Sequence, residues 1–154
     1  MADLFLDASA LVKRYVAEVG SAWVSSLALP SAGNLIFVAV ISAVEVASAI
    51  ARRTKPGNLN PADAALARSQ FDLDFAQQYR VIEITEAVLR RAVDLADRHA
   101  LRAYDAVQLS AVLTLNDRRV THALSATTLV SADHELNVSA RAEGLHADDP
   151  NSHP

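Results

Sequence analysis

The sequence has no cysteine and only four glycines, and just 5% of its 154 residues are aromatic. Without cysteine the chain can form neither disulfides nor thiolate metal sites, which fits a reducing cytoplasm, where we expect this protein to act. None of the glycines lies in a GxGxxG or GxxxxGK pattern, which argues against the common forms of nucleotide binding. The composition is instead 51% hydrophobic and rich in Ala, Val and Leu, which favours helices packed on a buried sheet over an all-β sandwich.

Several other signals are missing. The longest apolar run, residues 35–51, is shorter than the roughly 20 residues that a membrane-spanning helix needs, and it contains Glu45. The first residues carry Asp3 and Asp7 where an export signal would need a basic segment followed by an apolar one. The histidines form no HExxH pattern, and no GxSxG pattern marks a nucleophilic serine. We therefore expect neither a membrane segment nor an export signal, and neither a histidine metal site nor a serine hydrolase.

Strand-like and helical segments alternate along the chain. Short apolar or β-branched segments predict five strands, at residues 3–6, 35–40, 80–84, 128–130 and 144–146. Apolar residues at helical spacing predict helices at 8–16, 21–29, 42–53, from 61 onward, 85–100, 104–115 and 133–140. In the helix that begins at Pro61, the side expected to be buried carries Leu66, Phe71, Leu73 and Phe75. Alternating strands and helices predict an α/β fold with a parallel sheet covered on both faces. We expect one domain, residues 1–147, and a disordered tail at 148–154.

Four acidic residues stand where a strand gives way to a helix or where a buried helix begins: Asp7, Glu45, Asp105 and Asp133. Each has a structural explanation. Asp7 and Asp133 could be helix N-caps, and Asp105 could lie in a first helical turn, where the helix dipole favours an anion. Ser42 and Glu45 match the spacing of a capping box. Taken singly, these positions do not require a function.

Taken together, the four acids indicate a metal site. A parallel sheet brings the carboxyl ends of neighbouring strands to one edge, so the four carboxylates are expected to converge there. Such a cluster should have raised pKa values or hold a cation, because like charges repel and burial disfavours the charged form. Mg²⁺ and Mn²⁺ take oxygen ligands, and metal-assisted phosphodiester hydrolysis uses such an arrangement.

Four segments of the chain resemble the PIN-domain ribonucleases, and in particular the VapC-type toxins of type II toxin–antitoxin pairs. They read LFLDASALVKRYVAEVGS, VISAVEVASAIAR, LRAYDAVQLSAVL and LVSADHELNVSARAEGL, in family order and at family spacing. The first and third are specific, whereas the second and fourth would be weak alone. The resemblance implies a PIN-like three-layer sandwich with a parallel sheet of about five strands flanked by helices. It further implies homodimers and an antitoxin partner whose C-terminal segment wraps the toxin.

The resemblance also implies roles for individual residues. Asp7 and Asp105 would be the principal Mg²⁺ ligands, with Glu45 in the same cluster and Asp133 as its fourth member. Ser9 and Ser131 stand where the family often has a hydroxyl near the acids, with Ser131 replacing the commoner Thr, and both are candidates for contacting substrate. The predicted activity is a Mg²⁺-dependent or Mn²⁺-dependent endoribonuclease that hydrolyses RNA phosphodiester bonds.

Basic residues cluster near the acid-bearing segments although the net charge is −4. That charge argues against nucleic-acid binding through overall charge alone but leaves room for local contacts to phosphates. Arg102, close to Asp105, is the first candidate for binding the RNA backbone. The others are Lys13, Arg14, Arg52 and Arg53. A surface salt bridge is the alternative explanation for each.

Two other functions remain open from the sequence. A PIN-like module could bind RNA or assemble with partners without hydrolysis, although retention of all four acids speaks against it. A phosphatase could use Asp7 as its nucleophile, but such enzymes typically carry a second Asp two residues on, where this chain has Ser9.

Overall fold

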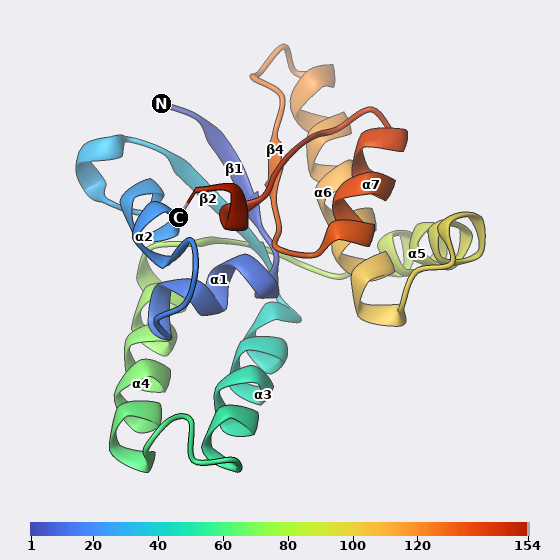
Figure 1. The fold of residues 1–154 in the computed structure, drawn as a ribbon. Helices are drawn as coiled ribbons and strands as arrows, with labels where there is room; N and C mark the ends of the chain where they lie inside the picture. Colours follow the sequence, from blue (N-terminus) through green and yellow to red (C-terminus); the bar gives the residue numbers. More distant parts are fainter. Residues whose placement is uncertain (154) are drawn as a thin grey trace.

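The computed structural model describes residues 1–153, which are built around one sheet of five parallel strands (Figure 1). The first strand of the chain, β1 (Asp3–Leu6), lies at the centre of the sheet, in the order β3-β2-β1-β4-β5. Every neighbouring pair is parallel, which confirms the predicted α/β sheet. The other strands are β2 (Leu35–Ala39), β3 (Arg80–Ile82), β4 (Thr128–Val130) and β5 (His146–Asp148).

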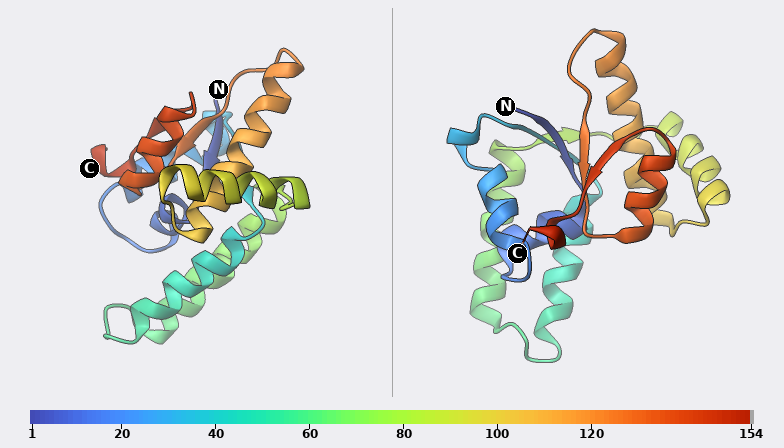
Figure 2. Two further views of the ribbon diagram at one scale, coloured as in Figure 1. Left: turned by 90° about the vertical axis from the view of Figure 1, so that its right-hand side faces the viewer. Right: turned by 45° about the horizontal axis from the view of Figure 1, so that its top comes forward.

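Within residues 1–153, seven α-helices cover the two faces of the sheet, as Figures 1 and 2 show. One face is covered by α1 (Ala8–Tyr15), α2 (Ser21–Leu27), α3 (Ser42–Thr54) and α4 (Pro61–Gln77). The other is covered by α5 (Glu86–His99), α6 (Ala103–Thr121) and α7 (His134–Ala142). The predicted three-layer sandwich is therefore confirmed. The helix predicted at 104–115 extends further at its C-terminal end, to Thr121.

Alternation along the strands divides the core into two parts. Leu4 and Leu6 of β1 are buried beneath α1 to α4, whereas Phe5 between them is buried beneath α5 to α7. Successive side chains of a strand point to opposite faces, so a strand covered on both sides reads as one continuous apolar run. No helix among residues 1–153 is both long enough and apolar enough to cross a membrane.

The buried side of α4 differs from the prediction. Phe71 is buried as predicted, but Leu66 and Leu73 are exposed, at 69% and 48%, and the buried stripe consists of Ala67, Phe71 and Asp74. These three residues follow the i, i+4, i+7 spacing of a single helical stripe. In the sequence a buried carboxylate looks like a surface residue, so the periodicity points to Leu66 and Leu73 in place of Asp74.

Contacts with neighbouring side chains compensate the burial of Asp74. Its Oδ2 accepts a hydrogen bond from Tyr15 at 2.9 Å and forms an ion pair with Arg14 at 3.3 Å. Its Oδ1 accepts a hydrogen bond from Gln70 at 2.9 Å. A buried charge with this many partners is tolerated, so the stripe containing Asp74 can pack inward.

The predicted disordered tail is wrong for the residues that the structure describes. Asp148 ends strand β5, and Pro150–Ser152 form a 3₁₀ turn in which Pro150 is buried. Pro154, the last residue of the predicted tail, lies outside the described residues.

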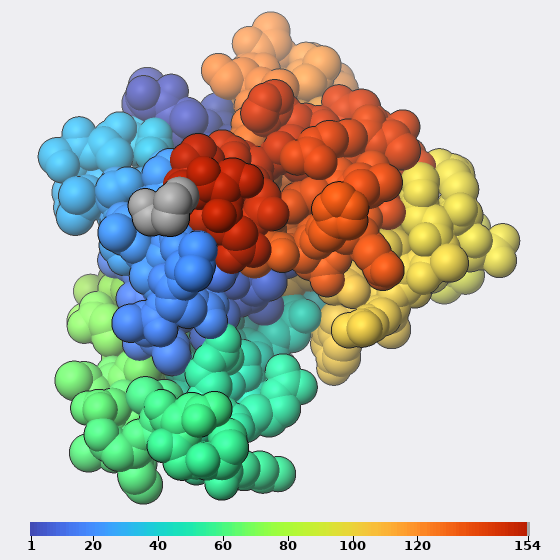
Figure 3. All heavy atoms as spheres, in the orientation of Figure 1, coloured from blue at the N-terminus to red at the C-terminus, as the bar shows by residue number. Residues whose placement is uncertain are grey.

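Side-chain contacts hold this C-terminal segment against α1 and α2. Asn151 Oδ1 accepts a hydrogen bond from Lys13 Nζ at 3.0 Å, and the His153 ring stacks on Trp23 with centroids 4.0 Å apart. Figure 3 shows the red C-terminal residues lying against the blue N-terminal region. Polar residues and prolines predicted a mobile end, but the partners that order them lie more than a hundred positions earlier in the chain.

Candidate active site

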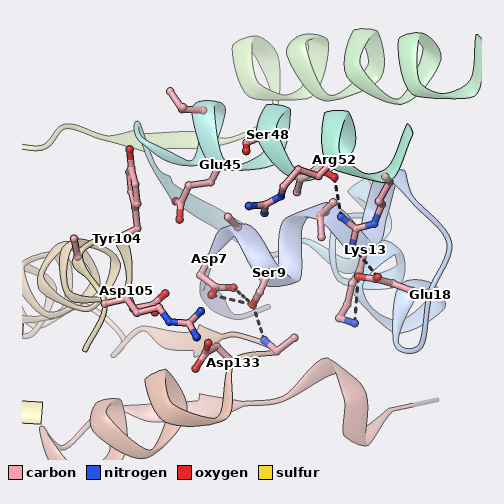
Figure 4. Close-up of a pocket in the computed structure, with 18 residues that line it drawn as sticks. Asp7, Ser9, Lys13, Glu18, Glu45, Ser48, Arg52, Tyr104, Asp105 and Asp133 are labelled. Carbon is pink, nitrogen blue, oxygen red and sulfur yellow. Dashed lines mark hydrogen bonds and ion pairs between the residues drawn. The ribbon is translucent and has the colours of Figure 1, made fainter. Parts of the chain in front are cut away.

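A pocket of about 570 Å³ lies at the carboxyl edge of the sheet (Figure 4). Strands β2, β1 and β4 are neighbours, so the segments that follow them meet at this edge, and the first turn of α6 closes the pocket from another side. All four acids predicted from the sequence line it: Asp7, Glu45, Asp105 and Asp133.

Asp7 is the most firmly held of the four acids. It follows the last residue of β1 and caps α1, where its Oδ1 accepts a hydrogen bond from the backbone N–H of Ala10 at 3.0 Å. The hydroxyl of Ser9 donates to both carboxylate oxygens, at 2.7 and 2.9 Å, and that of Ser131 donates to Oδ2 at 2.8 Å. The capping explanation is therefore correct, and the same contacts fix the carboxylate at the pocket wall.

The two serines act within the protein. Ser131 is fully buried, which leaves it no surface for the predicted substrate contact. Ser9 is half-buried and lines the pocket, so its contact with substrate stays a prediction. The Ser131 hydroxyl accepts a hydrogen bond from the backbone N–H of Asp133 at 3.0 Å, and the Ser9 hydroxyl accepts one from Ala132 N–H at 2.9 Å. The serine pair therefore ties the end of β1 to the end of β4 and orients Asp7 between them.

Asp133 also combines two roles. It is the N-cap of α7, with its Oδ1 accepting a hydrogen bond from Leu136 N–H at 2.9 Å. Only this one oxygen is used in the cap, and the residue is half-buried at the pocket wall.

The capping box predicted for Ser42 and Glu45 does not form. The N-cap of α3 is Ile41, and the helix start has no side-chain cap. Instead, both side chains face Gln108 of α6, whose Nε2 donates to Glu45 Oε2 at 2.6 Å and to Ser42 Oγ at 3.0 Å. This contact between α3 and α6 orients the Glu45 carboxylate.

The Asp105 carboxylate has the fewest hydrogen bonds among the four acids. It lies in the first turn of α6, half-buried, and within residues 1–153 its carboxylate has no hydrogen-bond or ion-pair partner. Figure 4 shows its side chain directed into the pocket, toward the side where Asp7 lies. A carboxylate with both oxygens free is available to bind a ligand from solution.

Burial is the largest cause of raised pKa values among these acids. It raises the pKa of Asp7 to about 6 and that of Glu45 to about 7. Burial likewise raises the pKa of Asp105. Repulsion between the carboxylates raises the same pKa values further. The charge of Asp105 raises the pKa of Asp7, and the charges of Asp7 and Asp105 both raise the pKa of Glu45. The charge of Asp133 raises the pKa of Asp105. The carboxyl groups therefore form one electrostatically coupled cluster, which a cation would relieve.

The basic residues near the site differ in their surroundings. Arg14 does not line the pocket, and its guanidinium donates to Tyr79 Oη at 2.7 Å and pairs with Asp74. These contacts favour the alternative explanation, a salt bridge, for Arg14. Lys13 is buried, with Nζ donating to Val19 O at 2.8 Å. Arg53 is paired with Glu18 at 3.0 Å.

Arg52 and Arg102 remain as free cations of the pocket. Both are exposed, both line it, and neither has an ion-pair partner within residues 1–153. The charge of Arg102 lowers the pKa of Asp105, against the larger effect of burial. Acids at the base of the pocket and unpaired arginines around it suit a phosphate bridged to a metal ion.

Gln108 is the site residue that the sequence analysis missed. It is 1% exposed, and its Oε1 has no hydrogen-bond partner within the described residues. A signal was available, because Gln108 is the only amide in the apolar stretch after Asp105 and lies three residues further on, on the same helical face. Its partner Glu45 lies on another helix, so only the fold reveals what it contacts.

The donor set fits a hard divalent cation in its chemistry. All four acids offer oxygen ligands, and the raised pKa values of Asp7, Glu45 and Asp105 indicate that the protein compensates the negative charge of these three poorly. Within residues 1–153 no three side chains of the ligating types are already spaced as a metal site. Mg²⁺ often keeps several waters and takes only one or two protein carboxylates, so a closed cage is not required.

Known proteins share both the sequence pattern and the fold. The family model of the PIN domain matches residues 4–138. Ribonuclease VapC45 of Mycobacterium tuberculosis is 31% identical over 141 residues, covering 92% of this chain and 91% of the relative. The chain therefore belongs to the PIN-domain family, and within it to the VapC ribonucleases.

Solved structures agree on the fold at lower sequence identity. PAE2754 of Pyrobaculum aerophilum superposes with a TM-score of 0.65 at 18% identity, covering 98% of this chain and 91% of that one. VapBC2 of Rickettsia felis, bound to a DNA fragment from its promoter, gives a TM-score of 0.62 at 15% identity, covering 96% of this chain and 98% of that one.

Proposed function

We propose that the protein is a metal-dependent endoribonuclease, the toxin of a toxin–antitoxin pair, that hydrolyses RNA phosphodiester bonds in the cytoplasm. The observation that carries this proposal is the convergence of Asp7, Glu45, Asp105 and Asp133 on one pocket that also holds the unpaired Arg52. The family membership supports a nuclease, and the pocket supports the four-carboxylate site.

The acids differ in the roles that their contacts allow. Asp7 and Asp105 would hold the ion, Asp7 from a rigid position and Asp105 with both oxygens free. Glu45, oriented by Gln108, would help to hold the ion or would orient the attacking water. Asp133 would complete the cluster through its remaining oxygen or through a bound water.

Mg²⁺ or Mn²⁺, when bound, would supply charge neutralisation at the phosphate and lower the pKa of an attacking water. The side chains of the protein would position the metal ion and the phosphate. Arg102 would hold a phosphate oxygen near Asp105, and burial of Asp7 would keep its carboxylate away from competing water. No side chain needs to act as a covalent nucleophile.

Partners are proposed from similarity. The relative is named as a VapC ribonuclease, and the Rickettsia felis structure contains a VapBC complex. We expect this chain to be neutralised by an antitoxin protein and to form homodimers. An adjacent gene for a small protein with a DNA-binding N-terminus would support the antitoxin, and copurification would test it.

The central test is cleavage of bulk RNA by the purified protein. We expect cleavage with Mg²⁺ or Mn²⁺, loss of cleavage in EDTA, and recovery when the metal is restored in excess. RNA binding without cleavage under all of these conditions would contradict the proposal and favour a binding module. Trapping of an aspartyl-phosphate, an acyl phosphate on Asp7, would instead favour a phosphatase.

Replacing Gln108 by Met should slow cleavage without destabilising the fold. Methionine has a similar size and removes the unpaired buried Oε1, so the free energy of unfolding should change by less than about 1.5 kcal/mol. Loss of the hydrogen bond should raise the pKa of Glu45 further and reduce cleavage roughly tenfold near neutral pH. Part of this loss should be recovered in alkaline buffer, where the carboxylate is charged again.

The matched control for Gln108→Met is Ser110→Ala. Ser110 is also buried on α6, but its hydroxyl donates to Val88 O at 2.7 Å, outside the pocket. The control should lose stability and keep its cleavage rate per folded molecule. Equal cleavage rates for Gln108→Met and the unmodified protein would show that Glu45 needs no orientation by Gln108.

A further inference from the structure

The aromatic residues of this protein are packed inside it, with one exception. Among the four Phe, three Tyr and one Trp, all within residues 1–153, only Tyr104 is exposed, with 54% of its surface accessible. Tyr104 directly precedes Asp105 in the first turn of α6 and lines the acidic pocket. The one aromatic ring left in solvent therefore lies beside the proposed reaction site.

The Tyr104 ring also has no partner of its own within residues 1–153. Trp23 stacks on His153, and the hydroxyls of Tyr15 and Tyr79 hydrogen-bond to each other. Tyr104 makes no such ring stacking or hydrogen bond in the described part of the chain. An unpartnered ring at a pocket is free to stack on a ligand, and this stacking would remove apolar surface from water.

The pocket has two chemically different ends. Figure 4 shows Tyr104 on the side of Asp105 and Glu45, while Lys13 and Glu18 lie at the opposite end. Val44, which is 63% exposed, is a further apolar residue of the lining. Tyr104 therefore adds an aromatic surface to the end of the pocket where Asp105 and Glu45 lie.

The same pocket also carries arginines that could bind a phosphate, Arg102 near Asp105 and Arg52 on α3. In Figure 4 the Arg52 side chain extends from α3 over the pocket, across from Asp7 and Ser9. Arg52 has no ion-pair partner within residues 1–153, so its guanidinium is free to donate hydrogen bonds to a phosphate. A nucleotide has both features that this pocket would recognise, because it carries a charged phosphate and a flat base.

We propose that Tyr104 is a stacking platform for an unpaired base of the RNA, adjacent to the phosphate that is cleaved. This inference rests on the proposed nuclease function and specifies its substrate as single-stranded or looped RNA. A base inside a duplex is covered on both faces by its neighbours, whereas an unpaired base can turn onto an aromatic ring. Stacking accepts every base, so Tyr104 selects for strandedness rather than for one sequence.

The test measures RNA binding in the Asp105→Asn background, so that the RNA stays intact. The probe is a short single-stranded oligoribonucleotide that contains 2-aminopurine, whose fluorescence falls when it stacks. Adding Tyr104→Ala should weaken binding roughly five- to hundredfold and abolish the quenching. Adding Tyr104→Phe, which keeps the ring, should preserve both. Binding of duplex RNA should be the same in all three proteins.

The matched control is Val120→Ala at the far end of α6. Val120 is 56% exposed and lies roughly 24 Å along the helix from Tyr104, outside the pocket. Its loss should leave RNA binding unchanged. Unchanged single-strand binding and quenching in the Tyr104→Ala protein would overturn the inference. If that protein also changed its oligomeric state, the ring would be assigned to a contact between protein chains.

The inference and the proposed function can fail separately. Cleavage by the unmodified protein together with Tyr104-independent RNA binding would overturn the stacking platform and leave the nuclease standing. Tyr104-dependent binding without any cleavage would support the platform and overturn the nuclease.

Discussion

Replacing Asp105 by Asn is expected to abolish RNA cleavage while the fold is retained. The carboxylate has no hydrogen-bond or ion-pair partner within residues 1–153, so the amide breaks no internal contact. It removes one full charge from a proposed metal site, and electrostatic stabilisation of several kcal/mol corresponds to a rate loss on the order of a thousandfold. Cleavage assays with purified protein, and growth after induction in cells, measure the effect.

Asp97→Asn is the matched control for this prediction. Asp97 is exposed on α5 and lies outside the pocket, so the same chemical change should leave cleavage and growth arrest intact. Circular dichroism establishes that both variants are folded. Full cleavage and toxicity in a folded Asp105→Asn protein would refute the proposed mechanism.

Replacing Asp7 by Asn should also stop cleavage, but it should make the metal-free protein more stable. In the folded protein the Asp7 pKa is raised from 3.8 to about 6, chiefly by burial. The folded state therefore binds more protons than the unfolded state between these values, and its stability falls as the pH rises through this window. Above the window the buried charge costs on the order of 3 kcal/mol, which asparagine avoids.

The pH dependence of unfolding tests this explanation. In EDTA at about pH 8 the melting temperature of Asp7→Asn should exceed that of the unmodified protein by several degrees. At about pH 4, where the Asp7 carboxyl is largely protonated in the folded state, the difference should disappear. Mg²⁺ should then stabilise the unmodified protein more than the variant. A variant that is less stable at about pH 8 would show that the hydrogen bonds to charged Asp7 outweigh the cost of burying it.

Local patterns predicted much of the fold because they reflect local physics. The β-branched run at Leu35 and the apolar segment after Asp3 are strands, and Asp7 and Asp133 are N-caps. The caps depend on interactions within a few residues, because each carboxylate accepts a hydrogen bond from the backbone three positions ahead. The strands are recognisable from their apolar and β-branched residues, although they pair with distant segments. The errors lie where a partner distant in sequence changes the meaning of a residue.

Asp74 and the C-terminal segment illustrate those errors. Asp74 reads as a surface acid until Arg14 and Tyr15, some sixty positions earlier, are placed beside it. His153 reads as part of a mobile end until Trp23 is found stacked against it. In both cases a contact with a distant residue offsets the cost of ordering or burying a polar side chain.

The candidate site likewise has features that the sequence predicts and features that only the fold reveals. The four acids follow from sequence alone, since each stands at the end of a strand or the start of a helix, and a parallel sheet gathers such positions at one edge. The sequence could not show which groups hold those acids or which remain free. Tertiary packing places Gln108 against Glu45, ties Ser131 to Asp7, turns Arg14 away and leaves Tyr104 in solvent. Hydrogen bonds and burial depend on which helices meet in space, and that depends on the whole chain at once.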